Sequence, residues 1–220
     1  MNTPEVLSAI ESVYEAFRHT PRPPRIEGCP CCLSPDQICR LVTSNLRQLS
    51  PEDLTDYASS IFLTVGDASD FRYLLPRILE ISITTRWWFP DLEIVLGKLD
   101  LAGWVNWAIG ERTALEGLFK ASFEAALESD DPAWCVDGWI CGLGRAGLDL
   151  SPFLGQLLQP ANHMTLGEYF SMNAGSLAKK GRLCNPFWPD DPTRELQAIE
   201  FLQSTIVQVI VWPQFGARPS

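Results

Sequence analysis

The chain has 220 residues, of which 46% are hydrophobic, and its 27 acidic and 17 basic residues give a net charge of −10. This length fits one large domain or two small ones, and the apolar fraction suffices for a buried core. The acidic balance disfavours direct nucleic-acid binding, and no apolar run reaches the roughly 18 residues of a membrane span. The first residues lack the basic start of a secretory signal, so we expect a cytoplasmic protein whose seven cysteines stay reduced unless they bind metal.

The first half of the chain shows helical periodicity. Val6, Ile10 and Val13 repeat at steps of three and four residues, which is typical of one apolar helix face. Gly66 is expected to end the third helix in a left-handed conformation. Pro76 lies inside a helical pattern, so we expect a kink there or the start of a second short helix. The helices predicted in this half span residues 1–18, 34–46, 50–66, 67–82 and 90–100.

The second half continues with a long helix predicted over residues 104–129, with a break near Gly110. A serine or aspartate followed by proline is a helix-start signal, because its oxygen accepts a backbone N–H and proline needs no donor there. Such signals occur at Ser34, Ser50, Asp131, Ser151 and Asp191. The other helices predicted here span residues 131–147, 151–158, 164–181 and 191–212.

These elements predict an all-α protein of about ten helices, arranged as an irregular bundle or a loosely solenoid-like stack of helix pairs. No fixed repeat and no alternating strand pattern is present. We expect a single domain over residues 1–220. Within it, residues 1–33, which comprise the first helix and a Cys/Pro-rich linker, can pack loosely.

The segment RIEGCPCCLSPDQICR, residues 25–40, contains four of the seven cysteines. Cys29 and Cys32 form a C-x-x-C pair, whose tight turn can point two thiolates at one metal ion. Zinc takes four such ligands in a tetrahedron, so two more are needed. The predicted zinc ligands are Cys29, Cys32, Cys39 and His19, with Cys31 and Cys184 as alternatives.

Two other interpretations of the cysteines stay open. A redox site needs a cysteine of lowered pKa at a helix N-terminus, usually after a strand, and no strand pattern precedes Cys32. Alternatively, the cysteines are small apolar residues around a tight turn at Pro30, reduced and inert. His163, the only histidine besides His19, has no clustered nucleophile. We therefore assign no catalytic residue and expect no enzyme.

A second candidate surface combines aromatic and acidic residues. Trp87, Trp88 and Phe89 are consecutive, so a helix cannot bury all three on one face. One alternative is that these side chains pack in the core, because tryptophan is usually buried. The other is that some are exposed beside acidic residues, as in a protein-binding hot spot. Acidic residues are frequent between Glu111 and Asp149. The predicted partner-binding residues are Trp87, Trp88, Phe89, Glu128, Asp130 and Asp131.

Two segments, IEGCPCC at residues 26–32 and DYASSIFLTVGDASDFRYLLPRILEI at residues 56–81, resemble a family of uncharacterised bacterial cytoplasmic proteins. The resemblance covers about Ile26 to Ile83. It implies a bacterial source and an all-helical fold, and it brings no catalytic residues. Proteins of this sort occur beside secreted polymorphic toxins as immunity factors.

These features predict a non-enzymatic protein that binds another protein. The sharper prediction is an immunity protein that neutralises a basic bacterial toxin domain through electrostatic steering and burial. The alternative is a small zinc-binding protein with a structural or regulatory cysteine cluster. A helical hydrolase with converging carboxylates is the least favoured prediction. Neither nucleic acid nor a membrane is an expected partner.

Overall fold

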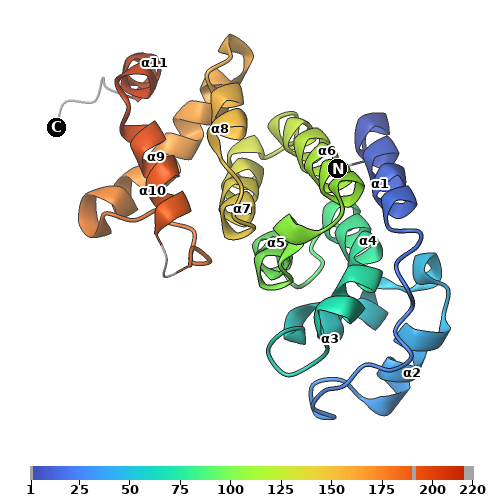
Figure 1. Ribbon diagram of the computed structural model, residues 1–220. Helices are drawn as coiled ribbons and strands as arrows, with labels where there is room; N and C mark the ends of the chain where they lie inside the picture. Colours follow the sequence, from blue (N-terminus) through green and yellow to red (C-terminus); the bar gives the residue numbers. More distant parts are fainter. Residues whose placement is uncertain (1, 190–191, 216–220) are drawn as a thin grey trace. The chain divides into compact units, whose positions relative to one another are not determined.

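The computed structural model describes residues 2–189 and 192–215, with side chains to Val211. Over these residues the chain forms eleven α-helices and three short 3-10 helices, and its only β-structure is two isolated bridges (Figure 1). The predicted all-α fold class is confirmed. No helix in the described ranges is long and apolar enough to cross a membrane.

The chain divides into two compact units, residues 1–122 and 123–220. The prediction of a single domain over residues 1–220 stays a prediction. The helices of the first unit are α1 (Pro4–Ala16), α2 (Pro35–Thr43), α3 (Pro51–Ser60), α4 (Ala68–Thr84), α5 (Leu92–Leu101) and most of α6 (Ile109–Leu127). The second unit contains α7 (Pro132–Arg145), α8 (Ser151–Leu157), α9 (His163–Lys180), α10 (Thr193–Gln203) and α11 (Thr205–Phe215).

Each unit has its own apolar core. In the first unit α4 packs against α1, α3 and α5, and in the second α9 packs against α7, α8 and α11. Each fully buried large side chain stabilises the fold by roughly 1.5–3 kcal/mol relative to its exposure. The first core includes Val6, Ile10, Leu41, Leu54, Tyr57, Leu74, Ile78, Leu96 and Phe119, and the second includes Phe123, Trp139, Ile140, Leu157, Leu166, Tyr169 and Leu202.

The predicted helix starts are local hydrogen-bonded caps. Ser34 and Ser50 each accept the backbone N–H three residues on, while Gln37 and Asp53 accept the cap N–H in return. Asp131 caps α7 by accepting from the backbone N–H of Trp134. These three predictions are confirmed. Asp191 lies outside the described residues.

The predicted cap at Ser151 is wrong. Leu150 already has helical dihedral angles, and the Ser151 N–H is bound by the side chain of Asp149 at 3.1 Å. The predicted C-terminal helix is interrupted, because Ser204 is extended, with ψ 148°, between α10 and α11.

Two helix boundaries also differ from the predictions. The helix predicted to end at Gly66 ends at Ser60, although Gly66 is left-handed, with φ +62°. The long helix begins at Ile109, after a separate 3-10 turn over Trp104–Asn106. Pro76 lies inside α4, which continues through it to Thr84, so no second short helix starts there, and the predicted kink stays a prediction.

Two buried charged groups of the first unit are paired. Arg72 donates to both carboxylate oxygens of Glu111, with Nη2 to Oε1 at 2.7 Å and Nη2 to Oε2 at 2.6 Å. Lys98 is buried in α5, and its Nζ donates to the carbonyl oxygen of Ile61 at 2.7 Å. The second contact stabilises the turn that follows α3, because a carbonyl beyond a helix end otherwise lacks a partner.

Candidate metal centre

The cysteine-rich loop is held against the turn between α3 and α4 by backbone contacts. Gly28 forms an antiparallel bridge with Val65. On either side, the Cys29 N–H donates to Thr64 O at 2.9 Å and the Gly66 N–H donates to Glu27 O at 2.7 Å. These two hydrogen bonds, which make up the bridge, restrict where Cys29 can lie, because they fix the backbone register.

Cys29 also begins a tight turn of its own. Its carbonyl oxygen accepts hydrogen bonds from the N–H groups of Cys32 at 3.0 Å and Leu33 at 3.1 Å. Leu33 is buried and anchors the far end of the turn, and Ser34 then starts α2. The turn is therefore fixed at both ends, with its cysteine side chains between the two anchors.

This turn brings three sulfur atoms together. The Sγ atoms of Cys29, Cys31 and Cys32 all lie within 4.8 Å of one another. Cys29 Sγ is 2.7 Å from Cys31 Sγ, and Cys31 Sγ is 3.9 Å from Cys32 Sγ. Cys31 is exposed and the other two are half-buried, so none of the three is a core side chain. The prediction of reduced, inert cysteines around a tight turn at Pro30 stays a prediction, as does the redox interpretation.

The three thiols influence each other's protonation. The hydrogen bond from Cys31 lowers the pKa of Cys29, because it stabilises the thiolate. The same bond, together with the one to Cys32, raises the pKa of Cys31 to about 11. The first proton therefore leaves Cys29 more easily than it leaves an isolated cysteine, and that thiolate is the first ligand available to a soft metal ion.

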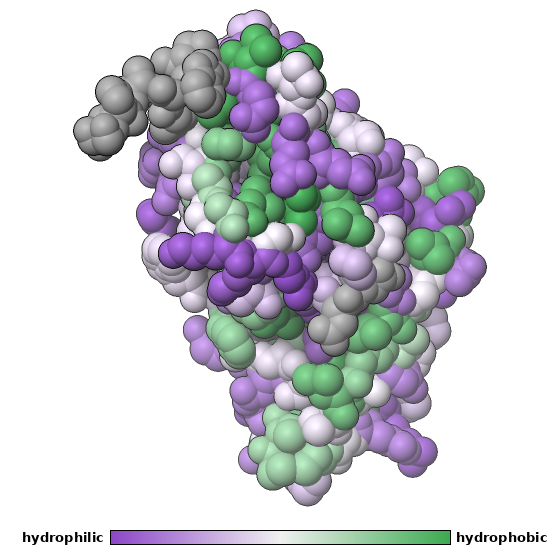
Figure 2. Space-filling view, turned by 90° about the vertical axis from the view of Figure 1, so that its left-hand side faces the viewer, coloured by the Kyte–Doolittle hydropathy of each residue, from purple (hydrophilic) through white to green (hydrophobic). Residues whose placement is uncertain are grey.

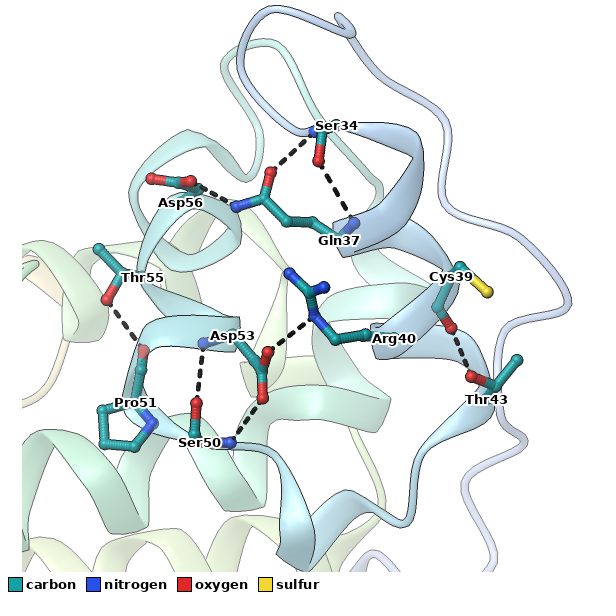
Figure 3. A network of polar contacts seen from close by, with 10 residues as sticks. All are labelled: Ser34, Gln37, Cys39, Arg40, Thr43, Ser50, Pro51, Asp53, Thr55 and Asp56. Carbon is teal, nitrogen blue, oxygen red and sulfur yellow. Dashed lines mark hydrogen bonds and ion pairs between the residues drawn. The ribbon is translucent and has the colours of Figure 1, made fainter.

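Polar contacts fix α2, which follows the loop, to α3 (Figure 3). Arg40 Nε donates to Asp53 Oδ1 at 2.9 Å, and Gln37 Nε2 donates to Asp56 Oδ2 at 2.6 Å. Both pairs are exposed, so each contributes a fraction of a kcal/mol, about 0.2–1. Their role is to set the position of α2, and with it the C-terminal side of the cysteine turn.

Cys39 and His19, the other two predicted zinc ligands, lie outside the group of three sulfurs. Figure 3 shows the sulfur of Cys39 on the side of α2 opposite to Gln37 and Arg40. His19 is exposed, and its Nε2 accepts a hydrogen bond from Arg18 Nε at 2.9 Å. The predicted four-ligand set stays a prediction. The geometry brings Cys29 and Cys32 together and adds Cys31, which the spacing offered only as an alternative.

The three consecutive aromatic residues have different environments. The Trp88 indole N–H donates to Pro51 O and Thr55 Oγ1, both at 3.0 Å, which ties it to α3. Trp87 is 84% exposed and has a left-handed backbone, with φ +62°, and Phe89 is 55% exposed. A non-glycine residue with positive φ is uncommon and costs about 1 kcal/mol or more. Here that conformation accompanies an exposed indole.

The acidic residues predicted to bind a partner lie around the start of α7. Glu128 and Asp130 are exposed, as is the helix cap Asp131. His163 begins α9, and its Nε2 lies 3.1 Å from the carbonyl oxygen of Leu158. The absence of a catalytic role for His163 stays a prediction.

Comparisons with protein-family models, with curated proteins and with solved structures found no match to this chain. The functional proposals therefore depend on the geometry of the chain itself.

Proposed function

We propose that this protein binds a zinc ion through the thiolates of Cys29, Cys31 and Cys32. The observation that carries the proposal is the grouping of these three Sγ atoms within 4.8 Å on an anchored, solvent-accessible turn. Thiolates are the ligands that zinc and other soft ions prefer.

The spacing of the sulfurs suits one shared ion. Two thiolates on a tetrahedral zinc lie roughly 3.8 Å apart, given a Zn–S bond of about 2.3 Å. The Cys31–Cys32 separation of 3.9 Å already matches this value. The Cys29–Cys31 separation of 2.7 Å must widen by about 1 Å, which loss of the shared proton permits. With three protein thiolates, the fourth position is left to water or to a partner's side chain.

Zinc analysis of the purified protein tests this proposal. The full-length chain, prepared under reducing and chelator-free conditions, should contain about one zinc per molecule. Cys29→Ser should lower the zinc content to less than half, whereas Cys39→Ser, which changes an exposed cysteine of the next helix, should leave it unchanged. A wild-type content below about a tenth of an equivalent would refute zinc binding.

We also propose that the protein acts as a non-enzymatic binding partner of another protein. The exposed Trp87 and Phe89 and the net charge of −10 support this proposal. On the face drawn in Figure 2, apolar side chains emerge at several places among hydrophilic ones. Exposed aromatics anchor interfaces, and a negative surface speeds docking of a basic partner.

The sharper proposal is an immunity protein of the cytoplasm that blocks a basic toxin domain. Its support is the acidic charge and the resemblance described from the sequence. Co-purification from the source cell tests it, with Trp87→Ala as the variant and Leu63→Ala, another exposed apolar residue, as the control. A basic toxin domain should co-purify with wild type and control and be depleted with Trp87→Ala. Absence of any such partner argues against the immunity function and leaves the zinc proposal intact.

A further inference from the structure

A hollow of about 520 Å³ lies in the second unit, between the start of α7 and one face of α9. Met164, Glu168 and Met172 recur at steps of four residues on α9, so they share that face. Residues 130–134 form the opposite wall. A volume of this size is within the roughly 300–1,000 Å³ of pockets that hold small molecules, and it is ample for one long side chain.

Three acidic residues line the hollow, and neither lysine nor arginine lines it. Asp130 and Asp131 come from the start of α7, and Glu168 comes from α9. No ion pair within the described ranges uses any of the three. Capping accounts for Asp131, but Glu168 lies beyond the first turn of α9 and has no such role. Like charges at one site repel one another, and a bound cation relieves that repulsion.

The same hollow exposes apolar surface. Trp134 is 65% exposed and Met164 is 64% exposed, and both line it. Thr165 also lines the hollow and is only 6% exposed, yet its hydroxyl forms no side-chain hydrogen bond to any described residue. An indole face attracts a cation, and methionine side chains adapt their shape to a bound group. The hollow therefore combines a cation's charge partners with a flat apolar surface.

We propose that this hollow binds an arginine side chain presented by a basic segment of a partner protein. A guanidinium group is planar, stacks on an indole and pairs with two carboxylates at once, which an ammonium group does less well. The net charge of −10 attracts such a segment from a distance. This inference rests on the interaction function proposed above and names the chemistry of the partner.

A peptide titration tests the inference on the full-length protein at low salt. The probe is acetyl-Leu-Arg-Gly-Leu-Arg-Leu-amide, and its control carries neutral citrulline at both arginine positions. Binding is followed through the indole N–H signals of the eight tryptophans in nitrogen-labelled protein. The arginine peptide should shift the Trp134 signal and bind at least about tenfold more tightly than the citrulline peptide.

Two double variants that remove the same number of charges distinguish the contribution of the hollow to peptide binding from that of the overall charge. Asp130→Asn with Glu168→Gln should weaken binding about tenfold. Glu116→Gln with Glu200→Gln removes the same charge from two exposed helix positions and should weaken binding less than about twofold. Trp134→Ala should weaken it about fivefold, whereas Leu101→Ala, which shortens an exposed apolar side chain of α5, should have no effect.

Any one of five results would overturn the inference. Four of them are equal binding of the citrulline peptide, equal weakening by both charge pairs, no binding at millimolar peptide, and equally tight binding of spermine at the same Trp134 signal. The last result would assign the hollow to a free polyamine. The fifth is peptide binding that Trp87→Ala abolishes and Trp134→Ala leaves unchanged. This result would show that the hollow is not the binding site, while the interaction function proposed above would stand.

Discussion

Gly28 lies so close to Val65 that a side chain at position 28 does not fit. A Cβ atom there would be 2.9 Å from Val65 Cα and 3.0 Å from Thr64 O. The absence of a side chain allows the backbone bridge that fixes the loop carrying Cys29. The candidate metal centre thus depends on a residue that contributes no ligand.

Gly28→Ala should weaken both zinc binding and the fold. The added Cβ pushes the loop away from Val65, so the zinc affinity should fall about tenfold and the free energy of unfolding by about 1–2 kcal/mol. Competition with a chromophoric chelator and urea unfolding measure the two effects. Gly117→Ala is the matched control, because beyond the adjoining residues and the backbone of its own helix no atom lies within 4 Å of its added Cβ. It should leave zinc binding unchanged and raise stability by about 0.5–1 kcal/mol.

The contribution of Asp70 to the stability of the fold should decrease as pH rises. Burial raises the pKa of Asp70 to about 6, above its usual 3.8, so the folded state holds a proton that the unfolded state has already lost. The free energy of unfolding should therefore fall between about pH 4 and pH 6 through this group. Asp70→Asn should remove that fall, as measured by urea unfolding across this range. An unchanged pH profile would show that the side chain is solvated in the folded protein.

Asp67, which caps α4 and forms a capping box with Asp70, should have the opposite effect. Hydrogen bonds from Ser69 and the backbone N–H of Asp70 lower the pKa of Asp67. Its contribution is present above the ordinary aspartate pKa of 3.8 and is lost as pH falls further through the folded value. Asp67→Asn should therefore reduce stability at neutral pH more than at the lowest pH at which the protein stays folded. The same urea series measures both aspartates.

The pair between Arg72 and Glu111 should contribute more to stability than an exposed pair. Glu111 is buried, and its Oε2 also accepts the Ala108 N–H at the start of α6. Glu111→Gln should cost about 2 kcal/mol, because it leaves Arg72 without its charge partner. Glu11→Gln, which breaks the exposed pair with Arg47, should cost less than about 1 kcal/mol. Equal losses in urea unfolding would contradict this ranking.

Local signals in the sequence predicted local structure correctly. Ser34, Ser50 and Asp131 each cap a helix through a backbone N–H three residues away, so neighbouring residues decide the outcome. The predicted cap at Ser151 is wrong because the Ser151 N–H donates to the side chain of Asp149. The break at Ser204 carries no glycine or proline, but the Ser204 hydroxyl accepts the Val207 N–H at 3.5 Å, so a serine cap marks the start of α11 and was not recognised in the sequence.

The candidate site was predictable only where its ligands are neighbours in sequence. The C-x-x-C spacing brings Cys29 and Cys32 together within one turn. The position of Cys39 and His19 relative to that turn depends on how the loop lies against residues 64–66, which spacing cannot show. Likewise, the hollow beside Trp134 joins residues from α7 and α9 that are thirty or more positions apart, and tertiary packing alone brings them together.

X-ray absorption at the zinc edge, which counts the sulfur atoms around the metal, tests the three-thiolate centre most directly. Wild-type protein and Cys39→Ser should both show about three sulfurs at about 2.3 Å, and Cys31→Ser should show about two. If Cys31→Ser keeps three sulfurs while Cys39→Ser falls to two, the ion is held by Cys29, Cys32 and Cys39, and the proposed centre is wrong.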